Sequence, residues 1–119
     1  ILKYPSDIFY DGELIAEAPV RERNALVGHS VLPNPDFPIL FHGIDGYDTR
    51  EGNSPSWFNR DEVAVVESRC EQILAGEPKI NPQEIGVVTP YRKQVQKLKY
   101  VFSRRGWDGI KVGSVEEFQ

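Results

Sequence analysis

The chain has 119 residues, 39% of them hydrophobic, and a formal net charge of −4 at pH 7. These values fit one folded domain with a modest core and exclude an intrinsically disordered chain. The negative charge argues against a protein that coats nucleic acid over its whole surface. The cations are nevertheless clustered, because residues 92–105 contain six lysines and arginines and no acidic residue. We therefore expect one local basic surface on an acidic whole.

The single cysteine, Cys70, excludes a disulfide framework and a cysteine-based zinc site. A lone cysteine on an apolar helix face is typical of a buried core position, and a reducing compartment such as the cytosol or nucleus is expected. No apolar run approaches the ~20 residues of a membrane span, and no signal peptide is evident. The sequence begins without Met and stops within a helix start, so we expect a piece of a longer protein.

The first third of the chain carries weak signals. Residues 1–14 predict a short helical turn followed by a loop, and residues 15–36 predict an irregular surface connection. Residues 37–44 (FPILFHGI) are almost all apolar and are predicted to form the first core strand, covered on both faces. His42 lies at the end of that run, and a histidine without nearby metal ligands is expected to be structural.

A polar loop and a helix follow. Residues 45–58 are rich in Gly, Asn and Ser, and a loop of this length in a small domain is usually functional or disordered. Asn59 is the predicted N-cap of the next helix, with Glu62 completing a capping box and Gly76 ending the helix. The predicted inward positions of this helix are Val63, Val66, Cys70, Ile73 and Leu74.

The last third alternates strand and helix. Residues 85–88 and 110–115 predict strands, and residues 91–105 predict the helix between them, with Gly106 as its C-cap. Val95, Leu98, Val101 and Phe102 are its predicted inward positions. Glu116 and Glu117 are expected to open another helix. This order predicts an α/β fold, a parallel sheet with flanking helices.

The chemistry converges where these strands end. Parallel strands share one carboxyl edge, so Thr89 and Ser114, each following a strand, should lie side by side next to helix N-termini. Arg92 and Lys93 fall in the first turn of a helix, where cations are unfavourable unless an anion offsets them. A phosphate is the natural candidate, and two solvated surface cations are the alternative. Together these groups predict contacts to a phosphodiester backbone.

Several sequence signatures are absent. The chain has no GxxxxGK[ST] phosphate loop, so it is not expected to hydrolyse a nucleoside triphosphate unaided. No Ser/His/Asp or Cys/His arrangement and no metal-ligand spacing is evident, so we assign no catalytic residue and no metal site.

The segments IGVVTPYRKQV and KVGSVEEFQ closely resemble motifs IV and V of the Upf-like superfamily-one RNA helicases. The loop FHGIDGYDTREGNSPSWFN and the start ILKYPSDIFYDGEL are similar to the Mov-ten/Armitage branch. The resemblance implies that residues 1–119 are the N-terminal part of the second RecA-like domain, a P-loop NTPase-type fold, incomplete at its C-terminal end. It also implies a part of an ATP-dependent 5′-to-3′ RNA helicase that is inactive alone.

The resemblance, together with the basic pair, assigns roles to particular residues. Gln119 would face the ATP cleft between the two RecA-like domains, and Tyr91 would shape the strand–helix turn with Arg92. The expected RNA contacts are Thr89, Ser114, Val115, Arg92, Lys93, Asn53 and Ser54.

The same resemblance implies cofactors and partners. The intact protein would use ATP and Mg²⁺, with none expected bound to this piece alone. Single-stranded RNA, the first RecA-like domain and Argonaute or Piwi pathway proteins are the expected partners, in the cytoplasm or its RNA granules, with no membrane. The alternative is a RecA-like protein-interaction module without motor activity.

Overall fold

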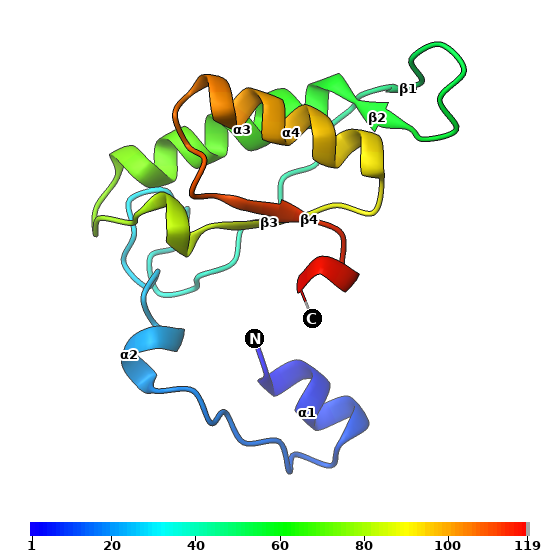
Figure 1. Cartoon of the computed structure of the whole chain (residues 1–119). Helices are drawn as coiled ribbons and strands as arrows, with labels where there is room; N and C mark the ends of the chain where they lie inside the picture. Colours follow the sequence, from blue (N-terminus) through cyan, green and yellow to red (C-terminus); the bar gives the residue numbers. More distant parts are fainter. Residues whose placement is uncertain (119) are drawn as a thin grey trace.

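The computed structural model describes residues 1–118. The elements in chain order are α1 (Lys3–Phe9), α2 (Val20–Arg23), β1 (Asp48–Thr49), β2 (Phe58–Asn59), α3 (Arg60–Ala75), η1 (Pro82–Glu84), β3 (Gly86–Val88), α4 (Arg92–Arg104), β4 (Lys111–Gly113) and η2 (Glu116–Phe118), where η marks a 3₁₀ helix. Figure 1 shows α3 and α4 packed over one face of the β3–β4 pair, with α1 and α2 on the other side. The α/β prediction is confirmed.

The core lies between the two long helices and the sheet. Its buried members are Val63, Cys70, Val95, Leu98, Phe102, Ile110 and Val112. Both helices therefore turn most of the positions that helical spacing predicts toward this core, since apolar residues three and four apart share one face. Ile73 differs, because it is half-buried and lines a cavity elsewhere. Burial raises the pKa of the Cys70 thiol from 9.0 to about 11, as expected for a thiol in a closed core.

The start of α3 is held by more than its own cap. The Asn59 side chain accepts the backbone N–H groups of Asp61 and Glu62, each at 3.0 Å, so the N-cap prediction is confirmed. The predicted return bond of a capping box, from the Asn59 N–H to the Glu62 side chain, is wrong. The Asn59 N–H instead donates to Gln94 Oε1 at 2.9 Å, and Gln94 Nε2 donates to Glu62 at 3.1 Å. Gln94, from α4, thus ties the two helices together.

The strands β3 and β4 are parallel, with Val88 opposite Gly113, as predicted. The connecting helix α4 ends before Gly106, whose φ of +71° favours glycine. Residues 116–118 form a single 3₁₀ turn.

The predicted core strand over residues 37–44 is wrong. This run pairs with no strand within residues 1–118, and its side chains are largely exposed, with Phe41 at 92%. Continuous hydrophobicity indicates a preference for apolar surroundings, but a strand also needs a neighbour that satisfies its backbone groups. The helix α2 was not predicted from the sequence. The antiparallel pairing of β1 with β2, which makes residues 48–59 a hairpin, was not predicted either.

Residues 1–57 attach to the body at the β1–β2 hairpin, where Glu51 pairs with Lys93 and Lys97, and around His29, which is only 1% exposed. Its Nε2 lies 3.2 Å from the Ile73 carbonyl, and its Nδ1 accepts the Val31 N–H at 3.1 Å. The ring is therefore neutral, with its proton on Nε2. His42, in contrast, is exposed and contacts Arg69 at 3.2 Å, which fits a structural role.

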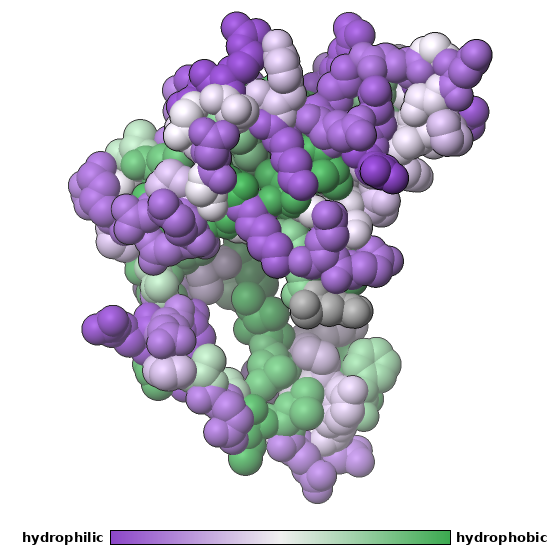
Figure 2. Space-filling model, in the orientation of Figure 1, coloured by the Kyte–Doolittle hydropathy of each residue, from purple (hydrophilic) through white to green (hydrophobic). Residues whose placement is uncertain are grey.

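The N-terminal segments leave much of their apolar surface open. Figure 2 shows hydrophobic side chains uncovered in the lower half of the molecule, below the sheet. Within residues 1–118, no helix combines the length and the apolar composition that crossing a membrane requires.

Candidate nucleic-acid interface

The two strand–helix junctions lie side by side. Since Val88 is opposite Gly113, Thr89 and Ser114 both follow the same end of the β3–β4 pair. The Thr89 N–H donates to the Gly113 carbonyl at 3.1 Å, which continues the ladder by one bond. The predicted shared edge is therefore present. Thr89 is only 9% exposed, so it offers a small area to a ligand.

Ser114 is engaged by the two acidic residues that follow it. Its N–H donates to Glu117 Oε2 at 2.7 Å. A hydrogen bond from the Ser114 hydroxyl, together with a backbone hydrogen bond at Glu116 itself, lowers the pKa of the Glu116 carboxyl. Val115 is 59% exposed beside them. A ligand that accepts a hydrogen bond from the Ser114 hydroxyl must therefore compete with the Glu116 carboxylate.

The anion beside Lys93 is Glu51, from the β1–β2 hairpin. Lys93 Nζ lies 2.8 Å from Glu51 Oε2, and Lys97 pairs with the other oxygen of the same carboxylate. Hydrogen bonds from both lysines lower the pKa of Glu51 from 4.5 to about 2. The Lys93 N–H also donates to Ser56 Oγ at 3.1 Å. Glu51 thus competes, from within the chain, with the phosphate that was expected to offset the charge of Lys93.

A cavity of about 540 Å³ opens on a different side of α4. Its α4 wall presents Arg92, Gln96 and Lys99, which recur at helical spacing, and Ser114, Glu116 and Glu117 line it opposite. Among residues 1–118, neither Arg92 nor Lys99 forms an ion pair. Four cations of α4 therefore divide into a neutralised set facing the hairpin, Lys93 and Lys97, and an available set facing this cavity, Arg92 and Lys99.

Asn53 and Ser54 lie in the hairpin loop and do not line this cavity. Asn53 is exposed, while Ser54 Oγ accepts the Ser56 N–H at 3.3 Å within the loop. Figure 1 shows the hairpin above α4 and η2 below the sheet. The structure therefore brings Arg92 and Ser114 to the lining of one cavity, with Thr89 and Val115 next to lining residues in the chain, and leaves Asn53, Ser54 and Lys93 outside it.

Gln119, the residue expected at the nucleotide cleft, lies outside the described residues. Within residues 1–118, no group of three or more His, Cys, Asp or Glu side chains could hold a metal ion. The described residues thus do not fit Mg²⁺ by themselves.

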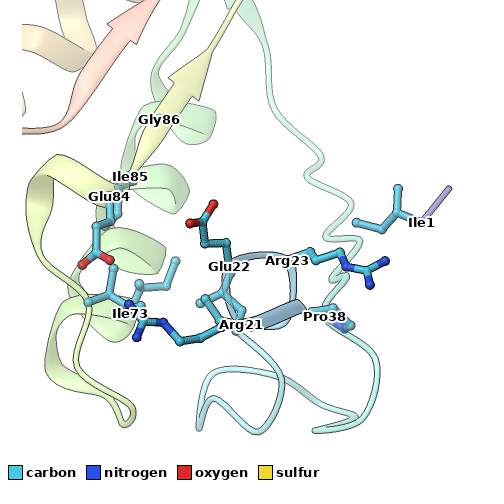
Figure 3. A pocket seen from close by; sticks show the side chains of 12 residues that line it. Ile1, Arg21, Glu22, Arg23, Pro38, Ile73, Glu84, Ile85 and Gly86 are labelled. Carbon is cyan, nitrogen blue, oxygen red and sulfur yellow. The ribbon is translucent and has the colours of Figure 1, made fainter. Parts of the chain in front are cut away.

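A second, larger cavity of about 760 Å³ lies between α2 and the start of β3. Figure 3 shows Arg21 and Arg23 extending to opposite sides, so their charges do not converge on one point. Much of its lining is apolar, including Leu26, Ile73 and Ile85. This arrangement is less suited to an anionic ligand than the cavity beside α4.

Sequence reasoning missed two groups. Gln96 and Lys99 could have been found, because they follow Arg92 at spacings of four and seven on a helix that was predicted. Glu51 could not, since its partners lie more than 40 residues away and no local pattern in the sequence places the hairpin against α4.

Comparison with known proteins agrees along the whole chain. The family model described as an AAA domain matches residues 1–119. RNA helicase Mov10l1 of Mus musculus is 43% identical over 120 residues, covering all of this chain and 10% of the relative. Probable RNA helicase armi of Drosophila melanogaster is 37% identical over 130 residues, covering all of this chain and 11% of the relative.

A more distant relative places the chain within the group. The regulator of nonsense transcripts 1 homolog of Drosophila melanogaster is 33% identical over 124 residues, covering 98% of this chain and 10% of the relative. The chain therefore spans about a tenth of the length of these relatives. The resemblance stated from the motifs is confirmed: the chain belongs to the Mov-ten/Armitage branch of the Upf-like superfamily-one RNA helicases.

Proposed function

We propose that this chain supplies RNA-backbone contacts to an ATP-dependent 5′-to-3′ RNA helicase, as part of its second RecA-like domain. One observation carries the proposal. Thr89 and Ser114 end adjacent parallel strands beside a cavity whose α4 wall presents two cations without acidic partners among residues 1–118. Relatives across the branch are named RNA helicases, which supports the same assignment.

The chemistry suits a backbone more than a base. Arg92 offers a planar fork of N–H donors that matches two phosphate oxygens, and Lys99 adds a point charge about two turns further along α4. Exposed Val115, next in the chain to the lining residue Ser114, provides apolar contact for a sugar, and Thr89 offers only a small area. Such contacts position a strand and do not read its sequence. A few of them give weak affinity, so the chain alone should bind RNA poorly.

The intact protein would add the motor. Its first RecA-like domain would face Gln119 across the ATP cleft, and ATP and Mg²⁺ would be held by residues outside 1–118. The chain alone is therefore proposed to be inactive. Argonaute or Piwi pathway proteins and a cytoplasmic, granule-associated location belong to the same proposal.

The test uses the full-length protein that contains this chain. Thr89→Ala, Ser114→Ala and Arg92→Ala should each lower RNA-stimulated ATPase activity, and Arg92→Ala should reduce the salt slope of RNA binding by about 1. Lys79→Ala is the matched control, because Lys79 is an exposed lysine paired with Glu77 away from the cavity. Unchanged ATPase activity and RNA affinity in all three variants would contradict the proposal.

A protein-interaction module without motor activity is the second candidate. The observation that favours it is the exposed apolar surface, including Ile1 at 84%, Phe41 at 92% and Tyr47 at 82%. Under this reading, the three substitutions above leave ATPase activity unchanged. Phe41→Ser would instead abolish binding of a protein partner in a pull-down with purified components.

A further inference from the structure

The cavity beside α4 has walls of opposite charge. Arg92 and Lys99 line one side, and Glu116 and Glu117 line the other. A free phosphate would be attracted to the first wall and repelled by the second. The cavity therefore suits a ligand that carries an anionic group and a hydrogen-bond donor close together.

Glu117 is a fixed acceptor on the acidic wall. Its Oε2 is held by the Ser114 N–H at 2.7 Å, while Oε1 accepts no hydrogen bond within residues 1–118. Gly113 makes room for this arrangement, because a Cβ there would lie 2.7 Å from Oε2 and 2.9 Å from the Glu117 Cβ. The carboxylate is thus held against the end of β4 with one oxygen available.

Of the two acidic side chains on this wall, Glu117 is the one that the Ser114 N–H holds in place, at 2.7 Å. The Ser114 hydroxyl and the Glu116 backbone lower the pKa of the Glu116 carboxyl. Glu117 is therefore the pre-positioned acceptor for a ligand.

We propose that Glu117 accepts a hydrogen bond from the 2′-hydroxyl of a nucleotide whose phosphate lies against Arg92 and Lys99, and so favours RNA over DNA. This inference rests on the proposed function, since it needs a nucleic-acid backbone in the cavity. A ribose phosphate is the unit in which an anion and a hydroxyl donor are neighbours, and the 2′-hydroxyl is the group that DNA lacks.

The experiment measures equilibrium affinity of the full-length protein for oligouridine and for deoxy-oligouridine of equal length, at one fixed salt concentration. Glu117→Ala should lower the ratio of RNA affinity to DNA affinity about tenfold, the contribution of one hydrogen bond to a charged group. Removing the negative charge should also raise DNA affinity, so the ratio is the diagnostic quantity. Glu17→Ala removes the same charge from an exposed position outside the cavity and should leave the ratio unchanged.

A second measurement needs no variant that could misfold. Oligouridines with a single 2′-deoxy position, moved along the strand, should reveal one position at which the wild-type protein loses affinity about tenfold. Glu117→Ala should be insensitive at that position, which makes the two changes non-additive. Uniform affinities along the strand in the wild-type protein overturn the inference.

Failure of this inference and failure of the proposed function give different results. If Arg92→Ala lowers RNA affinity but Glu117→Ala leaves the ratio unchanged, RNA lies in the cavity and Glu117 does not read its sugar. If Thr89→Ala, Ser114→Ala and Arg92→Ala all leave RNA affinity and ATPase activity unchanged, the proposed function itself fails.

Discussion

Residues 58–118 and residues 1–57 differ in the burial of their hydrophobic side chains. Within the described chain, every buried hydrophobic residue lies at position 58 or later, whereas most exposed large hydrophobic residues precede it. The radius of gyration is 16.4 Å, against about 13.5 Å for a compact domain of this length. Residues 58–118 form the buried core, and residues 1–57 lie against it.

Local sequence order explains the contrast. In residues 58–118, the helices α3 and α4 and the strands β3 and β4 lie close together in the sequence, and they pack on one another: β3 on β4, α3 on α4 and α4 on β4. In residues 1–57, the most hydrophobic run, 37–44, has no strand beside it. The candidate interface belongs to the packed segment, which gives its side chains a rigid support.

The largest expected effect comes from one side chain type placed in both segments. Phe102 is 2% exposed and contacts Trp107, whereas Phe41 is 92% exposed. Phe102→Ala should lower the free energy of unfolding by about 3–5 kcal/mol through lost burial and a cavity. Phe41→Ala should change it by less than about 0.5 kcal/mol. Urea denaturation of the purified chain checks both, and equal losses would break the contrast between the segments.

The next effect concerns His29, one of the places where the two segments are in contact. His29→Ala removes both ring hydrogen bonds, to Val31 and Ile73, and should lower local stability by about 2–4 kcal/mol. His42→Ala, at an exposed histidine, is the matched control and should change it by less than about 0.5 kcal/mol. Amide hydrogen exchange should show the loss of protection around residues 26–38, with α4 unaffected. Loss throughout α4 would mean that the segments unfold as one unit.

The sequence predicts the packed segment well because its signals are local. Helical spacing, the Asn59 cap, Gly106 and the strand at 85–88 each depend on residues within a few positions. Two errors concern distant partners. Residues 37–44 were expected to find a neighbouring strand, and Glu62 was expected to close a capping box in which Gln94 of α4 takes its place. The missed helix α2 is one turn of four residues without a side-chain cap.

The same limit applies to the candidate site. The edge that Thr89 and Ser114 share follows from strand order, and the structure has it. Which cations are available could not be predicted, because that depends on where the hairpin places Glu51. Long-range pairing of single charges leaves no periodic trace in a sequence.

A smaller effect should sharpen the description of the packed segment. Gln94, 4% exposed, bonds to both the N–H and the carbonyl of Asn59, so Gln94→Ala leaves these buried groups unpaired. The expected loss is about 1–3 kcal/mol in the free energy of unfolding. Gln96→Ala is the control, since it makes the same change at an exposed position on the same helix. If the two variants unfold at the same urea concentration, the link between the two helices is not a stabilising one.

The smallest effect concerns the pH dependence of the hairpin. Because the pKa of Glu51 is lowered from 4.5 to about 2 by Lys93 and Lys97, its pairing stabilises the docked hairpin above pH 4.5. That contribution should disappear as the pH falls from 4.5 through about 2, and it should be small because all three side chains are partly exposed. NMR titration of the Glu51 carboxyl measures the pKa directly. Lys93→Ala or Lys97→Ala should raise it toward 4.5, whereas Lys99→Ala, on the cavity side of α4, should not. An equal rise in the Lys99 variant would show that α4 acts as one basic surface, and the division of its cations into neutralised and available sets would then be wrong.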